Sequence, residues 1–143
     1  MQQRVGRLQV TVRPSPLTVT VTTAAGQLVQ ELVFEADGTL AFTVDEHPVL
    51  GLGEGGPRPA QGSPWREQPV QCDRRGALDT MEPRWQSDMC GSRNPAAVLM
   101  GTSGWGLFVA TPWVHVDMRD AARGVFTPRP PTEAERAPQT EGN

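Results

Sequence analysis

The sequence predicts an all-β fold: an antiparallel β-sandwich with long loops and a disordered C-terminal tail. Two observations lead to this prediction. Apolar and polar residues alternate with a period of two along several segments, as in strands that are buried on one face only. In addition, the 143 residues include 15 glycines and 14 prolines, a density of helix breakers that excludes an all-helical fold.

The first 45 residues carry the clearest strand pattern. Alternation of Leu, Val or Phe with polar residues predicts strands over residues 8–13, 17–22, 28–35 and 40–44. Pro14-Ser15-Pro16 separates the first two strands, and Ala25-Gly26 predicts the turn into the third. Asp37-Gly38 is the strongest hairpin signal in the chain. Four antiparallel strands are therefore expected before residue 46.

The middle of the chain is irregular. A short apolar run over 48–53 ends in glycines, and the residues from there to about 69 are mostly Pro, Gly and polar. Loops longer than about 12 residues inside a compact domain are usually functional or disordered, so we expect either a lid or slack chain. The stretch 74–94 is poor strand material.

Three further strands are predicted close together, over 96–100, 105–110 and 113–118, which brings the expected total to seven to nine. The segment 128–143 is rich in proline and has alanine as its only apolar residue, so it cannot bury enough surface to offset the cost of ordering the chain. We therefore expect a sandwich domain over 1–127 and a disordered tail over 128–143.

Charge and hydropathy exclude several classes of partner. Thirteen basic residues, all arginines, stand against sixteen acidic ones and form no cluster, which argues against nucleic acid and anionic membranes. No run approaches about 18 consecutive apolar residues, and the N-terminus does not resemble a secretory signal. A cytoplasmic location is the expectation from these features.

Nucleophilic and metal chemistry find little support. Ser103 lies in Gly101-Thr102-Ser103-Gly104, which predicts a tight hairpin rather than a catalytic serine turn. In that hairpin we expect Gly101 and Gly104 to have positive φ and Gly106 to allow a close approach of a neighbouring group. The candidate metal ligands lack the short spacings of zinc sites; they are His47, His115, Cys72 and Cys90. No metal or cofactor is expected. The two cysteines are expected to be free thiols, with a disulfide as the alternative.

Loop acids and tryptophans are the stronger candidates for function. Acidic residues in or beside the irregular stretches are Glu54, Asp73, Asp79, Glu82 and Asp88, each of which taken alone reads as a solvated loop charge. Trp65 and Trp85 lie in predicted loops, where an indole ring can stack on a sugar. Trp105 and Trp113 begin predicted strands and are expected in the core.

Four segments occur in a recognisable order. They are Gly51-Leu52-Gly53-Glu54, Asp73-Arg74-Arg75-Gly76, Trp85-Gln86-Ser87-Asp88 and the stretch from Gly101 to Val109 that contains Gly104-Trp105-Gly106. Together they resemble the N-terminal β-sandwich of family 31 glycoside hydrolases, the α-glucosidase and α-xylosidase family. The resemblance runs from about Leu8 to Thr127.

The resemblance implies a specific role. In that family the sandwich is a supersandwich similar to galactose mutarotase, so the resemblance implies that fold. The family's sandwich precedes a TIM barrel that carries the catalytic aspartates, and we expect no barrel in this sequence. We therefore expect an accessory domain of a retaining α-glycosidase that acts on α-linked oligosaccharides. The missing barrel would be its partner, and the chain alone would be inactive, with no catalytic residue of its own.

The resemblance also suggests binding residues. The family's sandwich lends a loop to the substrate pocket, in which a Trp-Asn-x-Asp segment touches sugar hydroxyls. Here Asp88 matches its acid and Trp85 its aromatic wall, although Gln86 replaces the asparagine. Gly91-Ser92-Arg93-Asn94-Pro95 resembles a segment in another branch of the family and makes Arg93 a second rim candidate. Asp73 and the two arginines after it are expected mainly to hold the ends of the loop in place.

Two alternatives remain open. The chain could be a free-standing carbohydrate-binding sandwich without catalysis, using Trp65, Trp85 and the loop acids. Epimerase chemistry by analogy with the mutarotase fold finds little support, because His47 and His115 read as strand-end residues. If the fold leaves one sheet face bare, we expect dimerisation or aggregation.

Overall fold

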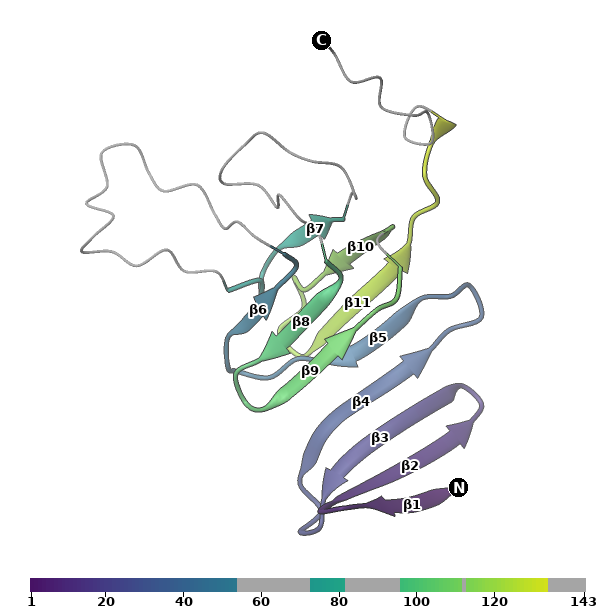
Figure 1. Cartoon of the computed structure of the whole chain (residues 1–143), viewed down its shortest axis with the longest axis vertical. Coiled ribbons are helices and arrows are strands. Elements are labelled where there is room, and N and C mark those ends of the chain that lie inside the picture. The colour runs from purple at the N-terminus through teal and green to yellow at the C-terminus, as the bar shows by residue number, and fades with distance from the viewer. Residues whose placement is uncertain (54–72, 82–95, 112, 134–143) are drawn as a thin grey trace, which may run out of the picture.

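A computed structural model describes residues 1–53, 73–81, 96–111 and 113–133. Within these residues eleven strands form two antiparallel sheets stacked as a sandwich (Figure 1). The strands are β1 (Gln2–Val5), β2 (Leu8–Pro14), β3 (Leu17–Thr23), β4 (Leu28–Phe34), β5 (Leu40–Thr43), β6 (Val49–Gly51), β7 (Leu78–Thr80), β8 (Val98–Gly101), β9 (Trp105–Phe108), β10 (Val114–Asp117) and β11 (Arg123–Pro128). The prediction of an all-β antiparallel sandwich is confirmed.

The two sheets differ in size. The larger has the order β1-β2-β3-β4-β5-β11-β10-β7, and the smaller has the order β6-β8-β9. Figure 1 shows the smaller sheet stacked over the β5, β11, β10 and β7 half of the larger one, while β1 to β4 extend beyond it. The last strand, β11, lies between β5 and β10 and so joins the N-terminal strands to the C-terminal ones.

The hydrophobic core fills the space between the sheets. Phe42 and Phe126 of the larger sheet and Leu99 of the smaller are each at most 2% exposed. Trp105, on β9, tilts against Phe42 with 6.0 Å between ring centroids. Burial of large apolar side chains is the main stabilising term of such a fold, at about 1.5–3 kcal/mol for each. Trp105 is therefore a core residue, as the sequence predicts.

The predicted hairpins are present. Between β4 and β5, the Asp37 carboxylate accepts a hydrogen bond from the Thr39 amide (2.9 Å), and Gly38 has a φ of 86°. Only glycine adopts such a φ without strain, so Asp37-Gly38 fixes this turn. All four strands predicted before residue 46 form, as β2 to β5.

The glycines around Ser103 act differently from the expectation. Gly104 has the expected positive φ, 110°, but Gly101 is not among the residues with positive φ. A Cβ on Gly101 would lie 2.1 Å from Cε2 of Trp105, whereas a Cβ on Gly106 would meet nothing closer than 3.9 Å. The close approach is therefore at Gly101, because its direct partner in the hairpin is the large Trp105 side chain.

Two short strands escape the sequence pattern. In β1 all four residues are exposed, and the strand is held by backbone pairing with β2, so no alternation marks it. β7 has three residues and lies within the stretch 74–94 that reads as poor strand material; it pairs with β10. The count of seven to nine strands was accordingly too low.

The start of the predicted tail is tied to the sandwich. β11 runs to Pro128, and the Arg129 amide donates to the Trp113 carbonyl (2.9 Å). The Arg129 guanidinium also lies 5.3 Å from the centre of the half-buried Trp113 ring. The disorder predicted for the remainder concerns mainly residues 134–143, which lie outside the described residues.

Candidate functional site

The predicted sugar-binding residues, Trp85, Asp88 and Arg93, lie in the segment 82–95, outside the described residues. The structure shows where that segment is attached. It begins after Met81, which follows β7 at the edge of the larger sheet, and it ends before Ala96, which leads into β8 of the smaller sheet. The segment therefore connects the two sheets.

The segment 54–72 is attached at the same edge (Figure 1). It begins after Gly53 and ends before Asp73. The Arg74 amide donates to the Val49 carbonyl (2.8 Å), and the Arg74 Nε donates to the Gly51 carbonyl (3.0 Å). Because Gly51 pairs with Leu99 on β8, the attachment points at Gly53, Asp73 and Ala96 lie around the paired strands β6 and β8. We call this region the loop base.

The turn at the end of β6 is strained. Gly51, Leu52 and Gly53 have consecutive positive φ values of 126°, 65° and 92°. A Cβ on Gly51 would lie 2.1 Å from the Val98 carbonyl oxygen, so only glycine fits there. The left-handed conformation of Leu52 is costly for a leucine. Two contacts offset this cost: the side chain is 1% exposed in the core, and the amide donates a hydrogen bond to the Val98 carbonyl (2.8 Å). The segment 54–72 thus starts from a fixed direction.

Asp73 and Arg75 form the first pair of the loop base. The Asp73 carboxylate accepts hydrogen bonds from the Val49 amide (3.0 Å) and from two nitrogens of Arg75 (2.7 and 3.0 Å to Oδ2). Arg75 also donates to the backbone carbonyls of Asp45 and Glu46. The side-chain hydrogen bond from Arg75 is the main cause that lowers the pKa of Asp73. Asp73 therefore pins the chain, as the sequence indicates.

Arg74 and Asp79 form the second pair. Asp79 lies on β7 opposite Val116, so its side chain shares the inward face with a core valine. Its Oδ1 atom lies 3.6 Å from a guanidinium nitrogen of Arg74, whose side chain is only 14% exposed. The Asp79 Oδ2 atom is buried and has no hydrogen-bond partner among the described residues. Burial raises the pKa of Asp79, and the charge of Arg74 opposes that shift.

The two carboxylates of the loop base are thus unlike each other. Asp73 uses both oxygens to hold the chain and stays ionised, while Asp79 sits where its charge is poorly compensated. The sequence names Asp79 only as one loop acid among several. The alternation of Asp79 and Met81 with the exposed Leu78 and Thr80 is the signal that would have placed it inward.

Ser103 belongs to a structural contact. Its side chain hydrogen-bonds to the Asp45 carboxylate, which also lies 3.3 Å from His47 Nδ1. A catalytic triad needs the histidine between serine and acid, whereas here the acid is in the middle. Asp45 therefore joins the β5–β6 connection to the β8–β9 hairpin, and the reading of Ser103 as a turn residue holds.

The candidate metal ligands do not gather in the part of the chain that the structure describes. No three of the His, Cys, Asp and Glu side chains placed there lie close enough to hold an ion. His115 Nδ1 is 3.0 Å from Thr80 Oγ1 on the neighbouring strand, and His47 accompanies Asp45. Cys72 and Cys90 lie outside the described residues.

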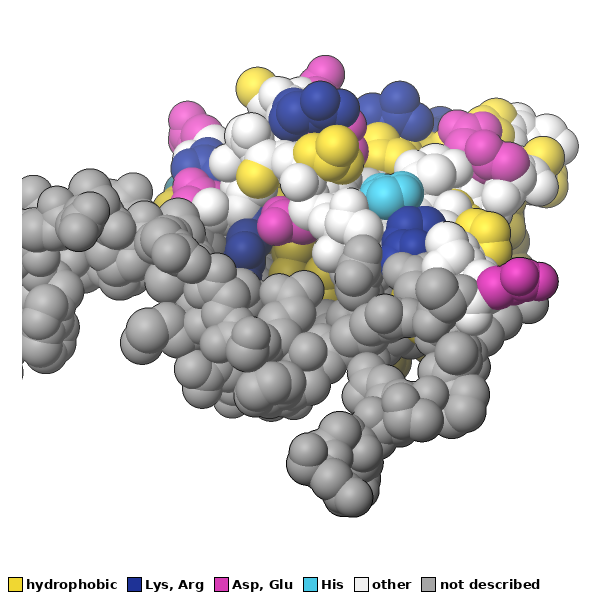
Figure 2. Space-filling view, turned by 90° about the horizontal axis from the view of Figure 1, so that it is seen from above, with side chains coloured by type: hydrophobic (Ala, Val, Ile, Leu, Met, Phe, Trp, Pro, Cys, Tyr) yellow, Lys and Arg dark blue, Asp and Glu magenta, His cyan; other side chains and the backbone are white. Residues whose placement is uncertain are grey.

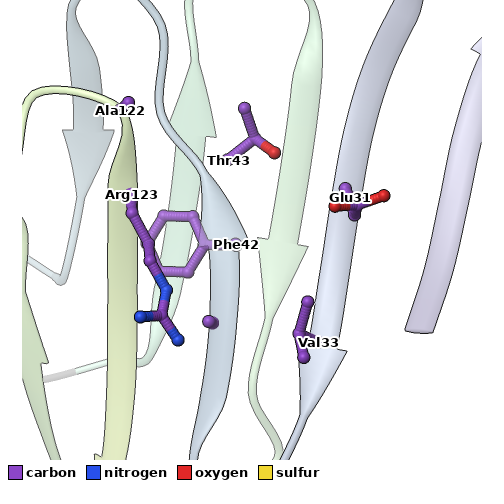
Figure 3. A pocket seen from close by; sticks show the side chains of 7 residues that line it. Glu31, Val33, Phe42, Thr43, Ala122 and Arg123 are labelled. Carbon is purple, nitrogen blue, oxygen red and sulfur yellow. The ribbon is translucent and has the colours of Figure 1, made fainter. Parts of the chain in front are cut away.

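A small hollow lies on the outward face of the larger sheet (Figure 3). It measures about 190 Å³ and lies between Glu31 on β4 and Arg123 on β11. Phe42 is the one aromatic residue among those that line it, and its ring is occupied in the core. The hollow therefore lacks an aromatic ring on which a sugar could stack.

A wider hollow of about 540 Å³ lies next to it and shares Arg123. Its acidic wall is Asp117, whose carboxylate is held by Arg119 (2.6 Å). The side-chain hydrogen bond from Arg119 lowers the pKa of Asp117 to about 2. Figure 2 shows that acidic and basic side chains interleave on the upper end of the molecule, where neither sign forms a continuous patch.

The comparisons with known proteins bear on the fold. No model of a known protein family matches the sequence, and no curated protein matches it. A GH31 dextranase of Flavobacterium johnsoniae, complexed with glucose, matches with a TM-score of 0.60 at 16% identity, over 90% of this chain and 16% of that chain. A mutant of the same enzyme, complexed with isomaltotriose, matches with a TM-score of 0.58 at 16% identity and the same coverage.

The chain has the fold of one part of a GH31 dextranase. The resemblance to the family 31 sandwich that rests on sequence motifs is thereby confirmed at the level of the fold. The chain spans only about 16% of the length of the dextranase. Within the described residues, no helix has both the length and the apolar composition needed to cross a bilayer.

Proposed function

We propose that this chain is an accessory sandwich domain of a glycoside hydrolase, and that it contributes residues 82–95 to the rim of the enzyme's sugar pocket. The observation that carries the proposal is the match of 90% of the chain to a part of the GH31 dextranase. Agreement between this fold and four ordered sequence motifs supports the same family.

The geometry of the loop base supports the proposed role of this domain, which is to hold a loop at the rim of the sugar pocket. A rim loop must be held in place at its ends, because a displacement of about 1 Å in a positioning group is costly for catalysis. The Arg74–Asp79 and Asp73–Arg75 pairs provide such anchors where the two long segments meet the sandwich. In this proposal Asp88 accepts hydrogen bonds from sugar hydroxyls, Trp85 forms a wall, and Arg93 donates two parallel hydrogen bonds.

The same match supports a proposal for the substrate class. The dextranase structures hold glucose and isomaltotriose, so α-linked glucose oligosaccharides are the substrates that we propose for the complete enzyme. Bond cleavage would be by double displacement on a separate TIM barrel, with none of the catalytic carboxylates on this chain.

Calorimetric titration of the 143-residue chain tests the proposal. Isomaltotriose, maltotriose and a xylosyl oligosaccharide should give no binding tighter than roughly 1 mM, since a rim alone covers one side of the sugar. Binding tighter than that, lost in Trp85→Ala, would support the free-standing carbohydrate-binding module instead. A complementary test reads the coding region around this domain, which should encode a barrel.

A further inference from the structure

One half of the larger sheet has an apolar face that the sandwich does not cover. Register places a set of side chains on the same side of β1 to β4 as the core residues of β5, because Val19 pairs with Leu32 and Leu32 pairs with Phe42. We call this set the bare face: Val5, Leu8, Val10, Val12, Leu17, Val19, Val21 and Phe34.

The bare face is separate from the core. The core cluster and the side chains packed against it reach Val29 and Leu32 on β4 but include no residue of β1, β2 or β3. Val5 is 55% exposed, Leu17 43% and Phe34 39%, although all are large apolar side chains. Figure 1 shows these strands extending beyond the smaller sheet. Soluble proteins seldom leave such a contiguous apolar surface without a partner.

The chemistry of the bare face selects its partner. The polar side chains that register places on the same side, at the margins of the face, are uncharged: Gln3, Gln30 and Thr23. A lipid surface is disfavoured, since the chain has a net charge of −3 and the register places Arg4 and Arg13 on the outward side of these strands. The outward side of the same strands bears Arg13 paired with Glu31 (3.2 Å), so that side cannot stack without burying charge.

We propose that the bare face binds the bare face of a second copy of this chain. Two uniform layers of Val and Leu are self-complementary, which a two-fold symmetric contact requires. Sheets that stack face to face lie about 10 Å apart, with their inward side chains interdigitated. The dimer would extend the sandwich over β1 to β4 of each chain.

The size of the face sets the strength of the dimer. Strands lie about 4.8 Å apart and rise about 3.3 Å per residue, so β1 to β4 present roughly 400 Å² of flat area per copy. The two copies together would bury roughly 800 Å² of flat area. This value leaves out the extra area of the protruding side chains and is a little below the 1,000 Å² or so that a biological interface needs. The dimer is therefore weak and dissociates on dilution.

Sedimentation equilibrium of the full chain, from about 5 µM to about 500 µM, tests the proposal. The average mass should rise from 15.5 kDa toward twice that value. Val10→Lys, on the bare face, should hold the mass at 15.5 kDa over the whole range. Thr11→Lys, its neighbour on the outward side of β2, should dimerise like the parent chain.

The contrary results are distinct. A parent chain that stays monomeric at every concentration would overturn the proposal, as would growth beyond the dimer. Equal loss of the dimer in both lysine variants would place the contact on another surface. Should circular dichroism show that Val10→Lys does not fold, Val12→Thr, which keeps a β-branched residue, should weaken the dimer by about tenfold. An unchanged dissociation constant there would also refute the bare face. None of these outcomes depends on sugar binding.

Discussion

The ring of Phe42 covers the α-carbon of Gly124 so closely that a Cβ on this glycine would lie 2.1 Å from the ring's Cζ atom. The two residues are direct partners on β5 and β11, the pair of strands that joins the N-terminal and C-terminal parts of the larger sheet. Phe42 in turn packs on Trp105 and Phe126. The absence of a side chain at Gly124 is therefore a condition for the packing of the core.

Replacement of Gly124 tests this contact. Gly124→Ala should lower the free energy of unfolding by at least about 1–3 kcal/mol, because the ring cannot move without displacing its neighbours in the core. Urea denaturation measures the change. Gly106→Ala is the matched control, since a Cβ there meets nothing closer than 3.9 Å, and it should be nearly neutral. Equal destabilisation by both changes would show that the glycine–ring contact is not the cause.

Asp73→Asn tests the first pair of the loop base. The pKa of Asp73 is lowered in the folded state, so its stabilisation is complete above the unfolded value of 3.8 and is lost as the pH falls through the folded value. At pH 7 the variant should lose about 1–3 kcal/mol, the usual worth of hydrogen bonds to a charged group, less for partial exposure. As the pH falls through the folded pKa of Asp73 the two proteins should converge, and a pH-independent difference would contradict the ion pair.

Asp79→Asn should behave in the opposite way. The pKa of Asp79 is raised by burial, so its ionisation costs no stability below pH 3.8 and an increasing amount as the pH rises toward the folded value. The asparagine carries no charge, and at pH 7 the variant should be as stable as the parent or more so. Thermal unfolding at pH 4 and pH 7 measures this effect. A large loss of stability at pH 7 would mean that the Arg74 pair outweighs the cost of burial.

Asp88→Ala tests the proposed rim in an enzyme that carries both this domain and its barrel. A lost hydrogen bond to a sugar hydroxyl costs about 1–3 kcal/mol, so kcat/KM should fall about 5- to 150-fold. Glu46→Ala removes an exposed acid elsewhere on the domain and should leave kcat/KM unchanged. A Trp85→Ala or Arg93→Ala variant should show an intermediate loss. Activity indifferent to Asp88 would remove the rim assignment.

The isolated chain should not hydrolyse an aryl α-glycoside. Catalytic groups of a TIM-barrel enzyme lie at the ends of the barrel strands, and in the function proposed here they belong to a separate barrel. A discontinuous assay with p-nitrophenyl α-glucoside at high protein concentration should give the rate of buffer alone. A rate that scales with the concentration of purified chain would refute the accessory role.

Local patterns in the sequence predict much of the fold. The alternation of apolar and polar residues predicted β2 to β5, and Asp37-Gly38 predicted a hairpin. Both signals depend only on residues that are neighbours along the chain. β7 was missed because three residues are too few to show a period, and it forms only against β10. The pairing of β5 with β11 links residues about eighty positions apart, which no local pattern encodes.

The candidate site shows the same division. Asp73, Arg74 and Arg75 form a contiguous motif, and their pinning role follows from the sequence. The partnership of Arg74 with Asp79 and that of Asp45 with Ser103 depend on how the strands stack. The sequence indicated Asp79 only as a loop charge and assigned no role to Asp45, because neither partnership is between neighbours along the chain.

The position of β11 has a consequence for synthesis on the ribosome. β1 to β5 can pair with one another as they emerge, but the gap between β5 and β10 is filled by β11, which is synthesised after every other strand that the structure describes. The larger sheet is therefore completed only after residue 128 has left the exit tunnel. Until then the nascent chain exposes the unpaired edges of β5 and β10, so the speed of translation between β10 and residue 128 should affect the yield of correctly folded protein.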